Sequence, residues 1–244
     1  MNAESTVFVV DDDQAMRASL QRLMESVGLP VKTYASAEAF LADCEPVRPG
    51  CLILDIRMPG GMTGLELQEK LAVDSICIPT IIISAHGDVE KAVRAMRCGA
   101  VDFIKKPYRG KVLLARVWEA LELDARTRRE NAERADIAAR VHRLTPREHE
   151  VMTLLAAGRP VKWIALELGL ARKTVDVHRG HVMTKMQAKS AVELARMVRV
   201  LRSSDGTRGM KHGSIVNSNQ AGRLRSDSQT SATCARDVQS ALGA

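Results

Sequence analysis

The sequence predicts an α/β fold, a five-stranded, doubly wound parallel sheet of the flavodoxin-like type, followed by a separate all-α domain of four helices. Two observations carry this prediction. Short apolar runs alternate with amphipathic stretches through the first half of the chain, whereas the second half shows a helical pattern only. Runs rich in β-branched residues are typical of strands buried on both faces, and helical crossovers join parallel strands.

Five pairs of a strand and a helix are expected in order. The strands correspond to the apolar runs at residues 7–10, 31–35, 51–54, 81–83 and 101–104. The helices correspond to the amphipathic stretches at residues 14–27, 36–44, 64–72, 88–98 and 111–123. Ligands bind at the carboxyl ends of the strands in such sheets, so the residues that follow each strand form the candidate site.

The domain boundaries follow from changes in composition. Residues 1–123 form the sheet domain, and the charged, Ala-rich residues 124–141 are expected to be a helical linker that continues its last helix. Residues 142–202 form the helical domain. Its helices are expected to start at Pro146, near Pro160, after Leu170 and near Ser190. Residues 203–244 are rich in Ser, Gly, Thr, Asn and Gln, and are expected to be a disordered polar tail.

Composition excludes several classes of protein. With 244 residues, of which 45% are apolar, the chain is long enough for two ordinary soluble domains. The N-terminus is polar and the apolar runs are only strand-sized, so we expect a cytoplasmic protein without a secretory signal or a membrane span. The five cysteines lack the spacing and the companion histidines of a zinc site, and are expected to be reduced thiols.

Charge is divided unevenly along the chain. Residues 1–123 carry 14 Lys and Arg against 17 Asp and Glu, whereas residues 142–203 carry 12 against 5. A basic segment of this size favours a polyanionic partner such as DNA, although a solvated charged surface would have the same composition.

Polar residues follow four of the five expected strands. The first strand is followed by Asp11, Asp12 and Asp13, and the third ends at Asp55. The fourth strand is followed by Ser84 and the fifth by Lys106. Neighbouring carboxylates repel one another and raise each other's pKa unless a cation neutralises them. The cluster therefore predicts Mg²⁺, which prefers oxygen ligands and keeps several waters. Its predicted ligands are Asp12, Asp55 and the backbone carbonyl of Arg57, with Asp11 acting through water.

With Mg²⁺ present, Asp55 is the carboxylate best placed to act as a nucleophile. The ion and the Lys106 ammonium would neutralise charge on a transferred phosphoryl group, and the product would be an aspartyl phosphate. Ser84 could then donate a hydrogen bond to a phosphoryl oxygen and shift the following loop. Each residue alone is an ordinary turn or cap residue, so the prediction depends on their joint occurrence.

The first half resembles receiver domains of two-component response regulators over residues 5–122. The resemblance lies in Val9-Val10-Asp11-Asp12-Asp13, Leu54-Asp55-Ile56-Arg57-Met58-Pro59-Gly60, Ser84-Ala85-His86-Gly87-Asp88 and Lys105-Lys106-Pro107-Tyr108. It implies phosphotransfer from a histidine kinase to Asp55 and a switch role for Phe103. It also implies no enzymatic activity beyond self-phosphorylation and autodephosphorylation. One departure is an extra residue between Pro59 and Gly64.

The basic half contains a helix-turn-helix pattern. Thr145, Pro146 and Glu148 form a capping box with proline at the first helical position. Residues 164–170 then give a helix and a Gly-containing turn, and a second helix follows that includes Thr174-Val175-Asp176-Val177-His178-Arg179. Its expected buried stripe is Val175, Val182 and Met186. Its residues expected to face solvent or DNA are Arg172, Lys173, Asp176, Arg179 and Lys185.

This half resembles LuxR-type output domains over residues 141–200, through a motif that runs to Lys185-Met186-Gln187-Ala188-Lys189-Ser190. With the receiver subtype, it resembles regulators like FixJ. The positions that match base-facing sites of the family are Asp176, Val177 and Gly180. The expected phosphate contacts are Lys173, Thr174, Arg179 and Lys185, and His178 is expected to pack or to face a phosphate. Two departures, Ala171 in place of a capping residue and Gly180 in mid-helix, predict a weakly stabilised helix.

The resemblance implies promoter DNA, a cognate histidine kinase and RNA polymerase as partners, with no role for a membrane. It also implies a homodimer when phosphorylated, and activation of transcription.

Two other classes of protein share part of this sequence pattern. In a haloacid-dehalogenase-type phosphohydrolase Asp11 would be the nucleophile, but that reading leaves Asp55 without a role and lacks a later acidic pair. A ligand-sensing LuxR-type factor would share the output domain, but the complete acidic cluster argues against it.

Overall fold

A five-stranded parallel sheet forms the centre of the first half of the chain. The computed structural model describes residues 5–43, 48–85 and 89–202; the predicted tail at 203–244 and the His86 to Asp88 part of the receiver motif lie outside the described residues. The strand order is β2-β1-β3-β4-β5. The strands are β1 Thr6–Val10, β2 Val31–Tyr34, β3 Gly50–Asp55, β4 Thr80–Ser84 and β5 Asp102–Lys105. The predicted doubly wound sheet is therefore confirmed.

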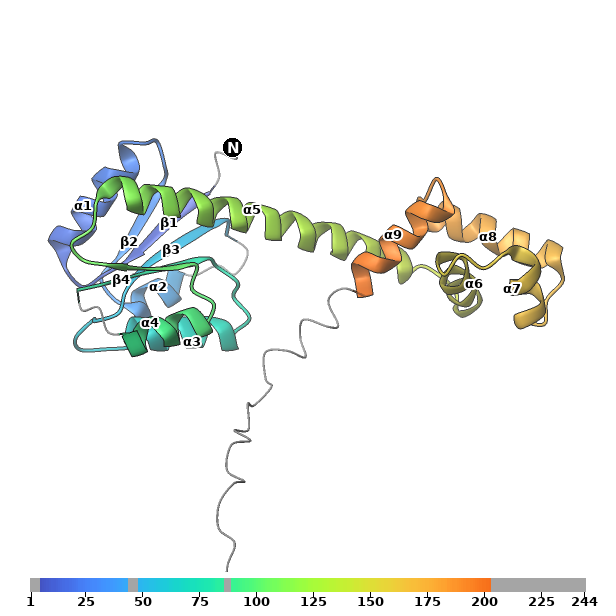
Figure 1. Cartoon of the computed structure of the whole chain (residues 1–244), viewed down its shortest axis with the longest axis horizontal. Helices are drawn as coiled ribbons and strands as arrows, with labels where there is room; N and C mark the ends of the chain where they lie inside the picture. The colour runs from blue at the N-terminus through green and yellow to red at the C-terminus, as the bar shows by residue number, and fades with distance from the viewer. Residues whose placement is uncertain (1–4, 44–47, 86–88, 203–244) are drawn as a thin grey trace, which may run out of the picture. The chain divides into compact units, whose positions relative to one another are not determined.

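Helices cover both faces of the sheet (Figure 1). On one face lie α1 Gln14–Glu25 and the first part of α5 Gly110–Val141; on the other lie α2 Ala37–Asp43, α3 Gly64–Val73 and α4 Val89–Arg97. Because side chains alternate along each strand, the sheet has two apolar cores. One contains Val7, Val9, Ile53 and Ile81 with Leu20 of α1 and Leu113 of α5. The other contains Val10, Leu52, Leu54 and Ile82 with Phe40, Leu67 and Ala95.

A third core joins the helices that follow. These are α6 Pro146–Ala156, α7 Val161–Glu167, α8 Arg172–Met186 and α9 Ala191–Arg202. Their buried residues include Val151, Ile164, Val175, Val182 and Leu194. The capping box at the start of α6 is present: the Thr145 hydroxyl accepts from Glu148 N–H, and the Glu148 carboxylate accepts from Thr145 N–H.

Helix α5 is continuous from Gly110 to Val141, and its two ends belong to different cores. Leu113 and Val117 pack against the sheet, whereas Ile137 packs with the residues of α6 to α9. None of the helices among the described residues combines the length and the apolar character that crossing a membrane requires.

Candidate phosphoacceptor site and nucleic-acid interface

The strand ends bring the predicted acidic residues and Lys106 to one edge of the sheet. Val10 pairs with Leu54, so Asp11 and Asp55 follow neighbouring residues of β1 and β3. Lys106 follows β5 and reaches across to both carboxylates. Its ammonium lies 2.8 Å from Asp55 Oδ1 and 2.9 Å from Asp11 Oδ2. The site thus joins Lys106 to Asp55 and Asp11, which are 51 and 95 residues away from it in the sequence.

Both carboxylates are nearly fully buried, and each accepts a second hydrogen bond from the backbone. The Asp55 side chain is 8% exposed and the Asp11 side chain 4%. Asp55 Oδ2 accepts from Arg57 N–H at 2.7 Å, and Asp11 Oδ1 accepts from Asp13 N–H at 2.9 Å. Asp55 therefore has a fixed orientation, set by Lys106 on one oxygen and by the backbone on the other.

Burial and charge act in opposite directions on the ionisation of this cluster. Burial raises the pKa of Asp11, although the hydrogen bond from Lys106 partly offsets it. For Lys106, burial favours the neutral amine, but the hydrogen bonds to Asp55 and Asp11 outweigh it and raise the pKa of Lys106 above its usual value. The lysine consequently stays protonated, and both carboxylates share its positive charge.

Asp12 and Asp13 have different surroundings from Asp11. Both are exposed. The Asp13 carboxylate caps α1 by accepting from Ala15 N–H at 2.8 Å. Arg17, which sequence reasoning missed, donates to the backbone carbonyls of Asp11 and Asp12 at 2.7 and 2.8 Å. Its place one turn into the helix after the acidic run was the available signal. Arg17 holds the turn that presents Asp12 at the edge.

The donors at this edge suit a hard divalent ion. In the parts of the chain that the structure describes, no three carboxylate, thiol or imidazole groups already form a metal-binding cluster. Mg²⁺ needs only one or two carboxylates, because it retains several waters. Asp11 and Asp55, held by the same ammonium, with Asp12 exposed beside them, are chemically suited to that role.

Ser84 and Phe103 lie on the two strands beyond Asp55. Asp55 pairs with Ile83, so Ser84 is one residue further along the neighbouring strand, where it is 2% exposed. Its backbone carbonyl accepts from Lys106 N–H at 2.7 Å. Phe103 is half-buried on β5 and packs against the core that contains Phe40 and Ala95. The predicted switch residues therefore lie on strands adjoining the acidic edge.

The atypical loop after β3 is held by a carboxylate from α2. Gly60 has a φ of +88°, which favours glycine. The Glu38 Oε1 accepts from Met62 N–H at 2.8 Å, and this bond lowers the pKa of Glu38. A Cβ at Gly61 would lie 2.8 Å from the same oxygen, so this carboxylate fits closely against the glycine. Glu38 therefore ties this glycine-containing loop to α2, a contact that the sequence pattern did not predict.

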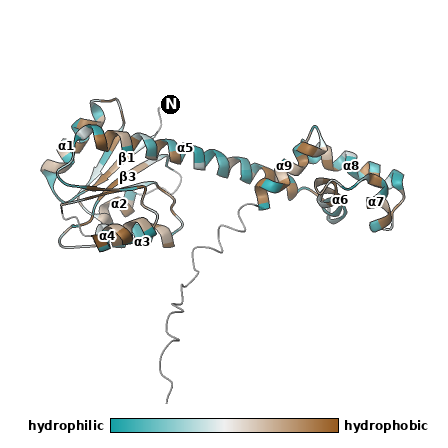
Figure 2. Ribbon diagram, in the orientation of Figure 1, coloured by the Kyte–Doolittle hydropathy of each residue, from teal (hydrophilic) through white to brown (hydrophobic). Residues whose placement is uncertain are grey.

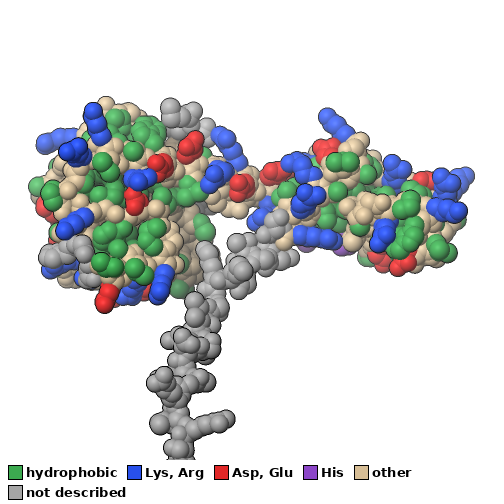
Figure 3. Space-filling model, viewed as in Figure 1, with side chains coloured by type: hydrophobic (Ala, Val, Ile, Leu, Met, Phe, Trp, Pro, Cys, Tyr) green, Lys and Arg blue, Asp and Glu red, His purple; other side chains and the backbone are tan. Residues whose placement is uncertain are grey.

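The predicted recognition helix, α8, presents most of its predicted residues to solvent. Val175, Val182 and Met186 are buried, as predicted. The exposed predicted residues are Arg172, Lys173, Thr174, Asp176, Val177, Arg179 and Gly180. Lys and Arg side chains are visible over the part of the surface formed by α6 to α9 (Figure 3). Val177 is 51% exposed, although it is apolar. This face combines cationic side chains with a small apolar one.

Lys185, which was predicted to face solvent or DNA, is half-exposed and forms an ion pair within the domain. Its ammonium lies 2.6 Å from Glu148 Oε2, and its side chain is 35% exposed. Glu148 is 5% exposed and lies 3.5 Å from His181 Nδ1. The hydrogen bond from Lys185, with that from Thr145 N–H, lowers the pKa of Glu148 to about 2. Glu148, which belongs to the capping box of α6, therefore also binds Lys185 in the last turn of α8. Helix periodicity does not predict this tertiary contact.

Neither His178 Nδ1 nor the N-terminus of α8 has a side-chain hydrogen-bond partner among the described residues. His178 is half-buried, and no described residue binds its buried Nδ1. No side chain caps the helix at Ala171, as predicted. Gly180 is exposed, and among the described residues no atom outside the local helix backbone lies within 4 Å of where its Cβ would be. Packing within the domain therefore does not require glycine at position 180.

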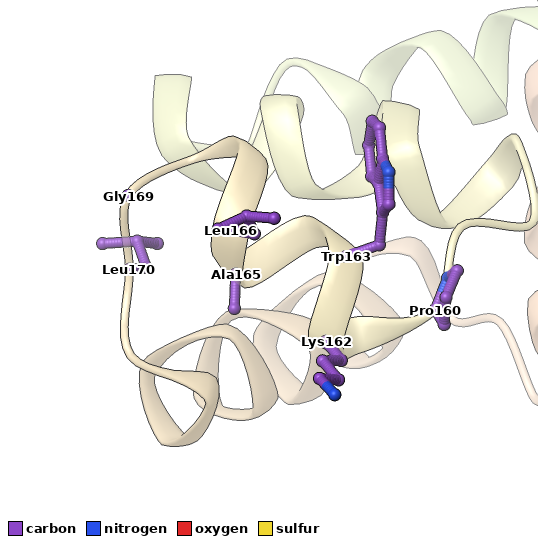
Figure 4. Close-up of a pocket in the computed structure, with 7 residues that line it drawn as sticks. All are labelled: Pro160, Lys162, Trp163, Ala165, Leu166, Gly169 and Leu170. Atoms are coloured by element: carbon purple, nitrogen blue, oxygen red, sulfur yellow. The ribbon is translucent and has the colours of Figure 1, made fainter.

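A shallow apolar depression of about 640 Å³ lies on α7 and the turn that follows it (Figure 4). It is lined by Pro160, Lys162, Trp163, Ala165, Leu166, Gly169 and Leu170. The Arg159 guanidinium lies 4.7 Å from the centroid of the Trp163 ring. The depression contains none of the predicted site residues.

Comparison with known proteins agrees with this arrangement. The chain matches the response regulator receiver domain over residues 7–118 and bacterial regulatory proteins of the luxR family over residues 142–198. Nodulation protein W from Bradyrhizobium diazoefficiens is 46% identical over 200 residues, which cover 82% of this chain and 88% of that protein. Transcriptional regulatory protein FixJ from Rhizobium meliloti is 44% identical over 192 residues, which cover 79% and 94%.

Two solved structures extend the likeness across both domains. Response regulator StyR has a TM-score of 0.73 and 42% identity, covering 80% of this chain and 98% of its own. Full-length FixJ from B. japonicum has a TM-score of 0.52 and 40% identity, covering 83% and 99%. The chain therefore belongs to the FixJ-type response regulators of two-component systems, which join a receiver domain to a LuxR-type DNA-binding domain.

Proposed function

We propose that Asp55 accepts a phosphoryl group from a histidine kinase and that this modification controls DNA binding by α8. The observation that carries the proposal is the Asp55 carboxylate, buried and oriented, with the Lys106 ammonium 2.8 Å away. A positive charge at that distance stabilises the charge that develops on the phosphoryl oxygens during transfer.

In the transfer step, an Asp55 oxygen attacks phosphorus and the bond from phosphorus to the donor breaks. The donor's nitrogen or oxygen leaves with the bonding electrons. The chain's part is to orient Asp55 through Arg57 N–H and to supply the Lys106 charge. Asp11, Asp12, Asp55 and the Arg57 carbonyl would hold Mg²⁺, which supplies further neutralisation of phosphate charge when bound.

The phosphoryl group would then act on the adjoining strands. It adds acceptor oxygens beside Ser84, whose movement would bias the packing of Phe103. The result is a homodimer that binds two half-sites of promoter DNA in the cytoplasm and activates transcription through contact with RNA polymerase.

For the DNA interface, α8 lies in the major groove. Lys173, Thr174, Arg179 and His178 face phosphates, whereas Asp176, Val177 and Gly180 face base edges. Support comes from the exposure of this face and from the uncapped, basic N-terminus of the helix. Lys185 is better assigned to holding α8 against α6, because Glu148 already binds it.

Labelling with acetyl phosphate tests the acceptor. The full chain should incorporate one phosphoryl group in the presence of Mg²⁺, and Asp55→Asn should incorporate none. Asp13→Asn is the matched control, because Asp13 is an exposed cap of α1 and should leave labelling unchanged. A label mapped to Asp11 would instead support the phosphohydrolase reading.

A further inference from the structure

Helix α5 carries a buried acidic residue at the point where it stops packing against the sheet. Its buried residues on this side are Leu113, Val117, Ala120, Leu121 and Asp124. Residues 125–136 include no buried residue, and the next one, Ile137, belongs to the core of α6 to α9. This middle segment of α5 is hydrophilic (Figure 2). Asp124 is therefore the last buried residue of α5 on the side of the sheet domain.

Asp124 and Arg128, one helical turn apart, hold the backbone that leads into β3. Asp124 Oδ2 accepts from Gly50 N–H at 3.0 Å and from Arg128 Nε at 2.7 Å. Arg128 also donates through Nη2 to the carbonyl of Arg48. The two side chains thus bind one donor and one acceptor of the same short segment, residues 48–50.

The chemistry of this contact indicates more than packing. The Asp124 side chain is 3% exposed, and burial of an isolated carboxylate is strongly unfavourable. An apolar residue could fill the same space without that cost, and replacement of buried ion pairs by apolar groups is often neutral or stabilising. Unlike an apolar contact, the pair makes directional hydrogen bonds. These bonds fix the rotation of α5 about its axis and its position along that axis relative to β3.

The segment that the pair holds is rigidly joined to the phosphoacceptor. Gly50 is the first residue of β3 and Asp55 is the last. A Cβ at Gly50 would lie 2.0 Å from the Thr6 carbonyl oxygen, so the start of β3 fits tightly against β1. β3 pairs with β1 from Gly50 to Leu54 and with β4 from Leu52 to Asp55. One central strand, paired on both sides from Leu52 to Leu54, therefore has Asp55 at one end and the α5 contact at the other.

We propose that Asp124 and Arg128 are positioning residues that couple the phosphorylation state of Asp55 to the DNA-binding domain through α5. The proposal rests on the proposed function above. The pair holds the part of α5 that leaves the sheet domain in a fixed direction relative to the sheet. Without it, the helix beyond Leu121 changes direction independently of the sheet, and phosphorylation no longer biases the helices that pack around Ile137.

The test compares Arg128→Gln and Asp124→Asn with Arg129→Gln in the full chain. Arg129 is the exposed neighbour of Arg128, so its variant makes the same change of charge outside the contact. The DNA is a duplex selected from random sequences by the phosphorylated wild type. Two quantities are measured for each variant: labelling of Asp55 by acetyl phosphate, and the ratio of DNA affinities with and without the phosphodonor.

We expect labelling to persist in all three variants. The affinity ratio should fall by about fivefold or more in Arg128→Gln and Asp124→Asn, and should stay at the wild-type value in Arg129→Gln. A wild-type ratio in Arg128→Gln and Asp124→Asn overturns the coupling role. Loss of labelling in both also overturns it, because the pair would then maintain the acceptor site itself. Absence of labelling in the wild type contradicts the proposed function instead.

Discussion

The Lys106 ammonium, just after β5, lies 2.8 Å from Asp55 Oδ1 at the end of β3, although β4 separates the two strands and 51 residues separate them in the sequence. The same nitrogen binds Asp11 at 2.9 Å. One cation thus balances two buried carboxylates, and its raised pKa keeps it charged at neutral pH. The same ammonium therefore stabilises the buried carboxylates and supplies the positive charge beside the proposed phosphoacceptor.

Lys106→Met is expected to slow labelling of Asp55 by acetyl phosphate on the order of 100-fold, because a charge that stabilises the developing phosphoryl oxygens is removed. The pKa of Asp11 should rise further, since the hydrogen bond that lowers it is lost. The labelling rate and the carboxyl carbon chemical shifts, followed against pH, measure the two effects. Lys105→Met, an exposed neighbour, is the control. Equal rates in both variants would rule out the assigned role of Lys106.

Acid should loosen the contact between α6 and α8. Lys185 and Thr145 lower the pKa of Glu148 to about 2, below its value in an unfolded chain. A carboxyl with a depressed pKa contributes stability above its unfolded pKa of about 4.3 and loses that contribution as the pH falls towards 2. Hydrogen exchange of α8 in the full chain should accelerate across this range. Glu148→Gln should exchange faster at neutral pH and lose this part of the pH dependence; an unchanged profile would contradict the ion pair.

Gly180→Ala should change stability and DNA binding in opposite directions. Alanine in a helix interior is about 1 kcal/mol more favourable than glycine, and the described residues leave room for its Cβ. The domain should therefore become more stable. DNA affinity should nevertheless fall by about tenfold, equivalent to about 1.4 kcal/mol, because the Cβ would occupy space that the bases approach. Thermal unfolding and fluorescence anisotropy measure the two effects. A more stable domain with unchanged affinity would place Gly180 away from the DNA.

Arg179→Ala should weaken binding to all DNA sequences alike. Arg179 is exposed on α8, and a phosphate contact contributes charge without reading bases. The slope of log affinity against log salt should decrease in magnitude by about 1. Titrations at several salt concentrations on specific and random duplexes measure it, with Arg129→Ala on α5 as the control. A loss confined to one sequence would mean that Arg179 reads a base.

The parallel sheet was predictable because its strands carry apolar runs, and four of the five runs are followed by polar or charged residues. Asp55 and Lys106 were predicted together for the same reason: strand order determines which residues meet at the carboxyl edge. The α6 capping box was predictable from local spacing alone, since Thr145 and Glu148 are three residues apart.

What the sequence left undetermined depends on tertiary contacts between distant polar residues. Glu38 holds the loop at Met62, Lys185 binds Glu148, and Asp124 binds Gly50. Each pair involves a charged residue on a helix surface, where periodicity predicts solvent exposure as readily as a partner. Only the packing of one element against another decides between the two.

Control of DNA binding by Asp55 is tested by measuring the DNA affinity of the full chain with and without acetyl phosphate, for the wild type and for Asp55→Asn. Phosphorylation is expected to tighten wild-type binding by about fivefold or more, with a shift from monomer to dimer by sedimentation. Asp55→Asn should show neither change and should bind as the unmodified wild type does. Equal stimulation of both proteins would contradict control of DNA binding by Asp55.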